Sequence, residues 1–265
     1  MAEAQGTESA ARVADVLLLF TDGPDRLGVS AVARELNLSK AVVHRILQTL
    51  LDRGLVSSDP DTRSYALGPA AAALGARALR ESHIRRVALP VLGSLQQATG
   101  ETTTLSARVP DGRVYLEQVE SRLEIKMTVE VGRRFPLHAG SSGMAILAFL
   151  PPAEREELLA GTLRALTTRT VVDAGELRRH IDRTRRLGYA TSDGQRQEGA
   201  SSVAAPVFGV DGTVLGSVSV CGPAHRIGTE ARESIAPLLR EAADRVSRGM
   251  GWRGGLPTES GQDRR

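Results

Sequence analysis

The chain has 265 residues, with 34 Lys plus Arg, 31 Asp plus Glu and a formal net charge of +3 at pH 7. This length suits two domains, and an aromatic content of 3% leaves few rings on which single-stranded nucleic acid stacks its bases. The single cysteine, Cys221, excludes an internal disulfide and a zinc cluster of cysteines. Because we find neither a signal-peptide pattern nor an apolar run of membrane-spanning length, we expect a cytoplasmic protein without a membrane partner.

Residues 29 to 54 predict two short helices joined by a tight turn. Ser30 is expected to cap the first helix, and Asn37 tolerates the left-handed conformation that ends it. Ser39 is expected to cap the second helix, which Gly54 then stops. The apolar stripe of the second helix consists of Val43, Ile46, Leu47 and Leu50. A protein uses this arrangement to place a helix in the major groove of DNA.

The polar face of the second helix and the segment after it carry the side chains expected to meet DNA. Apolar residues at 55–56 and 65–67 flank a turn rich in Pro and Asp, which predicts a β-hairpin wing with Arg63 at its tip. The expected DNA-contacting residues are Ser39, Lys40, Ala41, His44, Arg45, Gln48 and Arg63. The alternative is a small helical module that binds protein, or nothing.

The positions of the basic residues, rather than the net charge, must make this region attractive to DNA. Residues 1 to 80 hold nine Lys plus Arg and nine Asp plus Glu, so they carry no net positive charge. Since a basic surface is the usual requirement, the cations must gather on one face. These cations are Lys40, Arg45, Arg53 and Arg63. We therefore expect modest affinity from one copy, offset by multimerisation.

The rest of the chain predicts antiparallel hairpins with helices inserted between them, which makes the fold class α+β. Periodicity predicts helices at 83–99, 152–160, 173–187 and 229–248, a helix within 137–150, and strands at 102–109, 113–119, 125–131, 201–208 and 214–220. The expected divisions are a winged helix-turn-helix at 9–68, a linker helix at 69–82, a second domain at 83–250 and a disordered tail at 251–265. The linker is rich in Ala and poor in polar residues, so we expect it to pack on a second copy.

Three segments, in this order, resemble the IclR family of bacterial transcription regulators over about residues 9 to 248. They are LSKAVVHRILQTLLDRGLV followed by YALG at 38–56 and 65–68, VGRRFPLHAGSSGMAILAFL at 131–150, and RRLGYATSDGQRQEGASSVAAPVFGVDGTVLGSVSVCGP at 185–223. The resemblance implies an N-terminal winged helix and a C-terminal GAF-like domain that binds a small effector, usually a carboxylic or aromatic acid. It also implies homodimers, often paired into dimers of dimers, that bind palindromic promoter DNA.

The family builds its effector pocket from a small-residue turn and a facing pair of strands. Carried over position by position, the resemblance implies effector contacts from Ser141, Ser142, Ser192, Asp193, Ser202, Ser219 and Cys221. The chain departs from the family at Met144, where Lys is common, and at Gly194-Gln195, where two acids are common. We therefore expect the pocket to accept a less polar or larger ligand than the simplest keto acids.

Several candidate site residues have alternative interpretations. The serines of the turn at 140–143 also suit helix capping, and Cys221 also suits a buried position as a small apolar residue. His138 and Ser141 lack the G-x-S-x-G elbow of a nucleophile, so we expect no catalysis, and we expect no metal or cofactor. Together the motifs favour a ligand-responsive transcription regulator over the alternative, a metabolite-binding enzyme with a helical dimerisation module.

Overall fold

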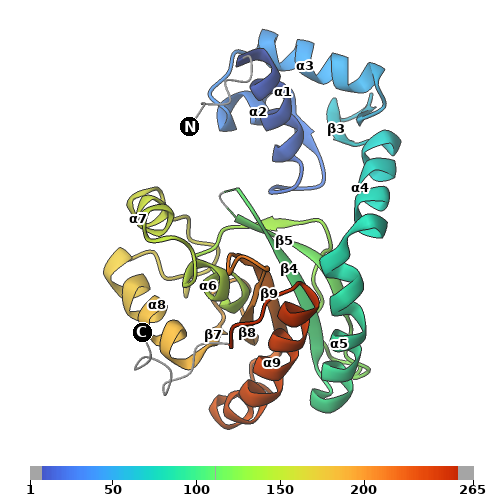
Figure 1. Ribbon diagram of the computed structural model, residues 1–265. Helices are drawn as coiled ribbons and strands as arrows, with labels where there is room; N and C mark the ends of the chain where they lie inside the picture. The colour runs from blue at the N-terminus through green and yellow to red at the C-terminus, as the bar shows by residue number, and fades with distance from the viewer. Residues whose placement is uncertain (1–7, 111, 256–265) are drawn as a thin grey trace. The chain divides into compact units, whose positions relative to one another are not determined.

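The computed structural model describes residues 8–110 and 112–255, and the chain divides into two units, Met1–Glu81 and Ser82–Arg265 (Figure 1). Each unit has its own hydrophobic core. The linker helix expected at 69–82 belongs to the first unit by its contacts. No helix in the described ranges is long and apolar enough to cross a membrane.

The first unit packs three helices against a small antiparallel sheet with the strand order β1-β3-β2, and a fourth helix follows the sheet. Its elements are α1 (Glu8–Leu19), β1 (Leu27–Gly28), α2 (Val29–Glu35), α3 (Lys40–Asp52), β2 (Val56–Asp59), β3 (Ser64–Leu67) and α4 (Pro69–Glu81). Strands β2 and β3 form the expected wing, and β1 adds a third strand that the sequence did not predict. The fold class predicted for this region, a winged helix-turn-helix, is confirmed.

The residues of α2, of α3 and of the turn between them explain how these helices begin and end, although the predicted start of α2 is wrong. The expected N-cap Ser30 is wrong, because α2 already begins at Val29 and its N-cap is Gly28, which has no capping side chain. Asn37 adopts a φ of 51°, the left-handed conformation that asparagine tolerates. Ser39 is the N-cap of α3, and its hydroxyl accepts a hydrogen bond from the Val42 amide at 3.3 Å.

The second unit is a six-stranded antiparallel sheet with the order β6-β5-β4-β9-β8-β7, covered by helices. Its elements are α5 (His83–Thr99), β4 (Thr102–Val109), β5 (Gly112–Val119), β6 (Arg134–Phe135), α6 (Ser141–Leu147), α7 (Pro152–Ala160), α8 (Ala174–Leu187), β7 (Ala190–Asp193), β8 (Ala200–Phe208), β9 (Val214–Pro223) and α9 (Thr229–Gly249). Since all of its pairings are antiparallel, the predicted α+β class is confirmed.

The two faces of this sheet differ in chemistry. Helices α5 and α9 run side by side against one face, where Leu105, Val218 and Val220 join the larger core (Figure 1). Side chains alternate along a strand, so the neighbours of these residues point to the opposite face. There β9 presents Ser219 and Cys221 below α6. One face of the sheet therefore lies on the larger apolar core, whereas on the other face these polar residues lie beside apolar ones such as Ala204 and Phe208.

Residues 125–131 form no strand, contrary to the sequence prediction. The amide of Val129 donates to the side-chain oxygen of Gln118 at 2.9 Å instead of to a backbone partner. Val129 is buried against the rings of Tyr115 and Phe135, and Met127 packs beside it. Of the alternating apolar residues, Met127 and Val129 pack on the ring cluster, whereas Ile125 is 68% and Val131 39% exposed. The pattern therefore reflects neither pairing in a sheet nor burial along its whole length.

The tail expected to be disordered from residue 251 begins with packed residues. Gly251 and Trp252 follow α9, and the Trp252 ring packs on Phe208 with ring centres 5.5 Å apart. The remainder of the predicted tail, 256–265, lies outside the described residues.

Candidate functional site

Helix α3 presents one exposed polar face. The side chains predicted to meet DNA are all exposed on α3 or at its start, and they are Ser39, Lys40, Ala41, His44, Arg45 and Gln48. The opposite face is buried in the core of the unit by the stripe that the sequence predicted. Helix α3 is thus held by its apolar face and leaves its polar face free to meet a partner.

The four cations that the sequence placed toward DNA are exposed and have no acidic partner among the described residues. Lys40 and Arg45 lie on α3, Arg53 ends it, and Arg63 adopts a φ of 51° in the turn of the wing. None of the four forms an ion pair with a residue in 8–110 or 112–255, whereas Arg26 is paired with Asp59 at 3.4 Å. Unpaired surface cations are the groups that DNA phosphates neutralise.

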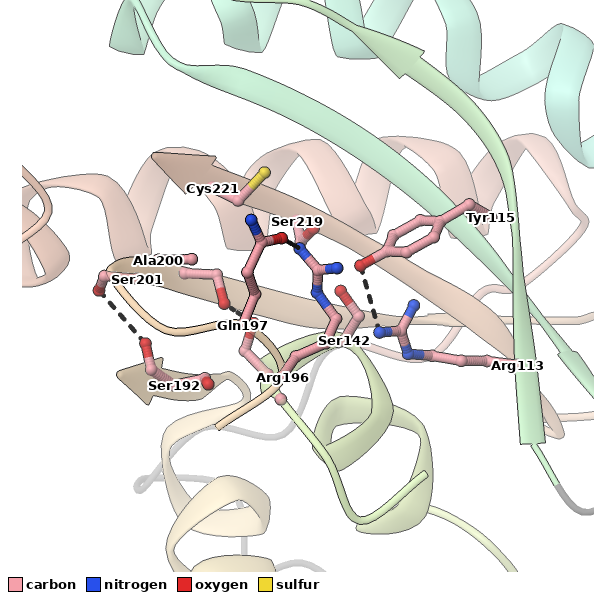
Figure 2. Close-up of a pocket in the computed structure, with 13 residues that line it drawn as sticks. Arg113, Tyr115, Ser142, Ser192, Arg196, Gln197, Ala200, Ser201, Ser219 and Cys221 are labelled. Atoms are coloured by element: carbon pink, nitrogen blue, oxygen red, sulfur yellow. Dashed lines mark hydrogen bonds between the residues drawn. The ribbon is translucent and has the colours of Figure 1, made fainter. Parts of the chain in front are cut away.

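The second unit contains an open pocket between α6 and the sheet (Figure 2). Six of the seven residues predicted to contact an effector line it, and they are Ser141, Ser142, Ser192, Ser202, Ser219 and Cys221. The other lining residues are Arg113, Tyr115, Gly140, Arg196, Gln197, Ala200 and Ser201. Segments far apart in the sequence therefore meet around one pocket.

Asp193, the seventh predicted residue, does not line the pocket, so the predicted effector contact from its side chain is wrong. It is exposed, and its carboxylate pairs with Arg169 at 3.1 Å and with Arg232 at 3.5 Å. Side chains alternate along strand β7, so Ser192 points inward and its successor points away.

Hydrogen bonds between hydroxyl groups fix the serine-lined wall. Ser141 and Ser202 lie with their oxygens 2.7 Å apart, which ties α6 to β8. Ser219 lies 2.6 Å from the hydroxyl of Thr104 on the neighbouring strand. Because each hydroxyl both donates and accepts, the wall can rearrange its protons to suit a ligand's acceptors.

Arg113 is the least expected residue of the pocket. It is 1% exposed, and its guanidinium donates to Ser106 at 3.0 Å and to the Tyr115 hydroxyl at 3.2 Å. Its Nε has no partner, and no carboxylate among the described residues forms an ion pair with it. Burial lowers the pKa of Arg113, so the pocket holds a cation at a cost in solvation.

Aromatic rings surround the Arg113 guanidinium. Its central carbon lies 4.4 Å from the centre of the Tyr115 ring and 5.2 Å from that of Phe135. The sequence contained a signal for this pair, because Arg113 and Tyr115 lie two apart on a predicted strand and must share one face. Nothing in the local sequence indicated which face that was, so both residues were missed.

Cys221 is buried in the pocket wall, and burial raises the pKa of its thiol to about 11. The thiol is therefore protonated at neutral pH and offers a small, weakly polar surface rather than a nucleophile. His138 bonds through Nε2 to the carbonyl oxygen of Arg164 at 2.9 Å, while Ser141 bonds to Ser202. Within the described ranges no group of three His, Cys, Asp or Glu is placed to hold a metal ion.

Comparisons with known proteins match both units. Residues 9–60 match the IclR helix-turn-helix domain, and residues 76–248 match the bacterial transcriptional regulator IclR C-terminal domain. The glycerol operon regulatory protein of Streptomyces griseus is 34% identical over 94% of this chain and 98% of its own. The regulator KdgR of Escherichia coli is 30% identical over 95% of this chain and 98% of its own.

Solved structures agree with these matches. A putative IclR regulator from Silicibacter sp. TM1040 superposes with a TM-score of 0.79 at 32% identity, over 92% of this chain and 97% of its own. An IclR homologue from Microbacterium hydrocarbonoxydans, solved with 4-hydroxybenzoate, gives a TM-score of 0.68 at 29% identity, over 92% of this chain and 99% of its own. These relatives are named as regulators of transcription, not as enzymes. The chain belongs to the IclR family of bacterial transcriptional regulators.

Proposed function

We propose that this regulator binds palindromic promoter DNA as a homodimer, or as a dimer of dimers, through α3 and the wing. We further propose that a small carboxylic or aromatic acid in the pocket of the second unit controls this binding. The observation that carries the proposal is Arg113, a buried cation without an anionic partner in the described chain, in a pocket lined by hydroxyl groups. An acid anion supplies the missing charge.

Two further observations support the proposal. The exposed cations of α3 and the wing lack acidic partners among the described residues, so they are available to phosphates. A relative of similar fold was solved with 4-hydroxybenzoate, which is an aromatic acid. If such an acid binds here, its carboxylate is expected at Arg113 and the hydroxyls of Ser141 and Ser202 are expected to accept or donate further hydrogen bonds.

The DNA-reading role of α3 is tested by Arg45→Ala, with Arg12→Ala as the matched control. Arg45 is exposed on the polar face of α3, whereas Arg12 lies on α1 and pairs with Glu8. Because a good side-chain contact with a base contributes about 1–3 kcal/mol, Arg45→Ala is expected to weaken operator binding by roughly 5- to 150-fold. A mobility shift on fragments of the promoter region measures this, and unchanged affinity and footprint in the Arg45 variant would remove α3 from the interface.

The control by an acid is tested on the full chain with 4-hydroxybenzoate and benzoate as first probes. A bound acid is expected to change operator affinity by about 5- to 150-fold, a coupling of roughly 1–3 kcal/mol. Ser141→Leu fills the pocket and should abolish both acid binding in calorimetry and the shift in operator affinity. Ser94→Leu, an exposed position on α5, is the control and should retain both. Acid binding that survives Ser141→Leu contradicts the assignment of the pocket.

A further inference from the structure

Two cations, not one, reach the pocket. Arg113 lies at its buried end, and Arg196 reaches it from residues 194–199, which connect β7 to β8 (Figure 2). The central guanidinium carbon of Arg196 lies 5.3 Å from the Phe135 ring centre and 5.9 Å from that of Tyr115. Both guanidinium groups therefore lie beside the same two rings.

No acid of the described chain neutralises either cation. Among the described residues, Arg196 donates a hydrogen bond only to Gln197, at 3.3 Å, and forms no ion pair. Glu101, whose charge acts on Cys221 in the pocket wall, is already bound by Arg226 at 2.5 and 2.9 Å. Asp193 is likewise bound by two arginines outside the cavity. The pocket therefore holds two positive charges and no compensating negative charge from these residues.

The two cations differ in their freedom, which divides their roles. Arg113 is fixed by hydrogen bonds to Ser106 and Tyr115, and its unpartnered Nε is buried. Arg196 is partly exposed, lies on a connecting segment and has most of its N–H groups unused. An anionic group held by Arg113 is thus fully enclosed, whereas one held by Arg196 lies nearer to solvent.

We propose that the effector of this regulator carries two anionic groups on a short carbon skeleton. Its inner carboxylate binds Arg113, and its outer group, a carboxylate or a phosphate, binds Arg196. The skeleton between them lies along the Tyr115 ring and the serine-lined wall, and Arg196 sets the preference for a doubly charged acid. This inference rests on the proposed function, because it assumes that the pocket binds an acid effector.

The test compares acids that differ in one charge. Calorimetry on the full chain at fixed ionic strength compares the affinity of each doubly charged acid with that of its singly charged counterpart. The pairs are succinate and butyrate, glutarate and valerate, and terephthalate and benzoate. A further ligand, 3-phosphoglycerate, tests a phosphate as the outer group. Because a hydrogen bond between charged groups contributes about 1.5–3 kcal/mol, at least one doubly charged acid is expected to bind about tenfold or more tightly than its singly charged counterpart. The same acid is expected to shift operator affinity, and whether a dicarboxylate or the phosphate ester does so identifies the outer group.

Substitutions then assign the preference to Arg196. Arg196→Gln should remove most of the preference for the doubly charged acid and leave the affinity for the singly charged acid nearly unchanged, and Arg196→Lys should restore part of the preference. Arg133→Gln is the matched control, because Arg133 also lies over Phe135 at 5.2 Å but is paired with Glu130 and does not line the pocket. Arg133→Gln should leave the preference intact.

Two results overturn the inference alone. The first is a singly charged acid that binds as tightly as its doubly charged counterpart and shifts operator affinity. The second is an Arg196→Gln variant that loses affinity for both classes of acid equally. If no acid of either class binds or shifts operator affinity, the proposed acid control fails as well. Melting curves of each variant without ligand confirm that its fold is intact.

Discussion

At the scale of single residues, Arg113 shows how the binding site opposes the stability of the fold. Its guanidinium is buried without an anionic partner in the described chain, so folding removes a charge from water and gains only ring contacts and hydrogen bonds to two uncharged hydroxyl groups. The desolvation of an unpaired ion costs several kcal/mol. A bound anion offsets that cost, which makes the ligand a contributor to the free energy of unfolding.

Cys221 makes the free energy of unfolding depend on pH in the alkaline range. Burial raises the pKa of its thiol from 9.0 to about 11 in the folded chain. The unfolded chain therefore releases this proton first, and the contribution of the protonated thiol is complete below pH 9 and is lost as the pH rises towards 11. We expect the free energy of unfolding to fall by about 1.4 kcal/mol per pH unit across this window from this residue alone.

Denaturant titrations of the wild type and of Cys221→Ala at matched pH values isolate this contribution, because other groups titrate equally in both. The difference between the two free energies should be constant below pH 9 and should change above it. A constant difference throughout would mean that the thiol ionises as easily in the folded chain as in the unfolded one.

The sequence was sufficient for the serines of the pocket but not for its arginines. Ser141 and Ser142 belong to a recognisable turn, and Ser219 and Cys221 share one face of a strand. Arg113 and Arg196 come together only through the pairing of distant strands and the path of residues 194–199. Asp193 was misassigned because its neighbour Ser192, not Asp193, faces inward.

At the scale of elements, α6 is the piece whose position matters most for the pocket. All seven of its residues are buried, and its second residue accepts a hydrogen bond through its backbone oxygen from the Ser217 hydroxyl at 3.0 Å. Gly143 permits a separate close approach, because a Cβ at that position would overlap the backbone of Leu137, in the segment before α6. The glycine therefore allows the first turn of α6 to pack directly against the backbone of Leu137.

Gly143→Ala is expected to lower the free energy of unfolding by about 1–3 kcal/mol, since an added methyl in a tightly packed site forces the backbone to move. Acid affinity should fall with it, because α6 carries two pocket serines. Gly93→Ala in α5 is the matched control: a Cβ there meets no atom within 4 Å, so it should raise the free energy of unfolding by about 0.5–1 kcal/mol. Chemical denaturation measures both, and equal effects of the two substitutions would contradict the packing argument.

Periodicity predicted most helices and strands, because burial of one face leaves a clear pattern in long elements. Helix α7 at Pro152–Ala160 and strand β4 at Thr102–Val109 have the predicted bounds. The pattern failed where pairing is short, as in the two-residue strand β1, or where apolar residues alternate without pairing in a sheet, as at 125–131. Strand pairing depends on distant partners, which a local pattern does not contain.

At the scale of the whole molecule, the linker helix α4 is the element with least support from its own chain. None of its thirteen residues is buried, although Ala and Leu dominate it, and Leu74 is 62% exposed. An apolar helix face left in water is costly, so a second copy is the occupant that we expect to cover it. Such a dimer would also present two copies of α3 to DNA at once.

Leu74→Glu is expected to shift the chain from dimer towards monomer, because two carboxylates would enter the proposed apolar contact between copies. Sedimentation velocity measures the shift, and operator binding should weaken in parallel. Val210→Glu, at a position 76% exposed in the turn between β8 and β9, is the control and should change neither. A Leu74→Glu variant that stays dimeric and binds DNA normally would place the dimer contact elsewhere.

Trp252 has a consequence for observing the protein. It is the single tryptophan of the sequence, and it packs on Phe208 in the cluster formed by α6, α7 and α8. Tryptophan emission therefore comes from the second unit alone, and the DNA-binding unit contributes none of it. The intrinsic fluorescence of the unlabelled chain therefore reports on the second unit alone, even when DNA is bound to the first unit.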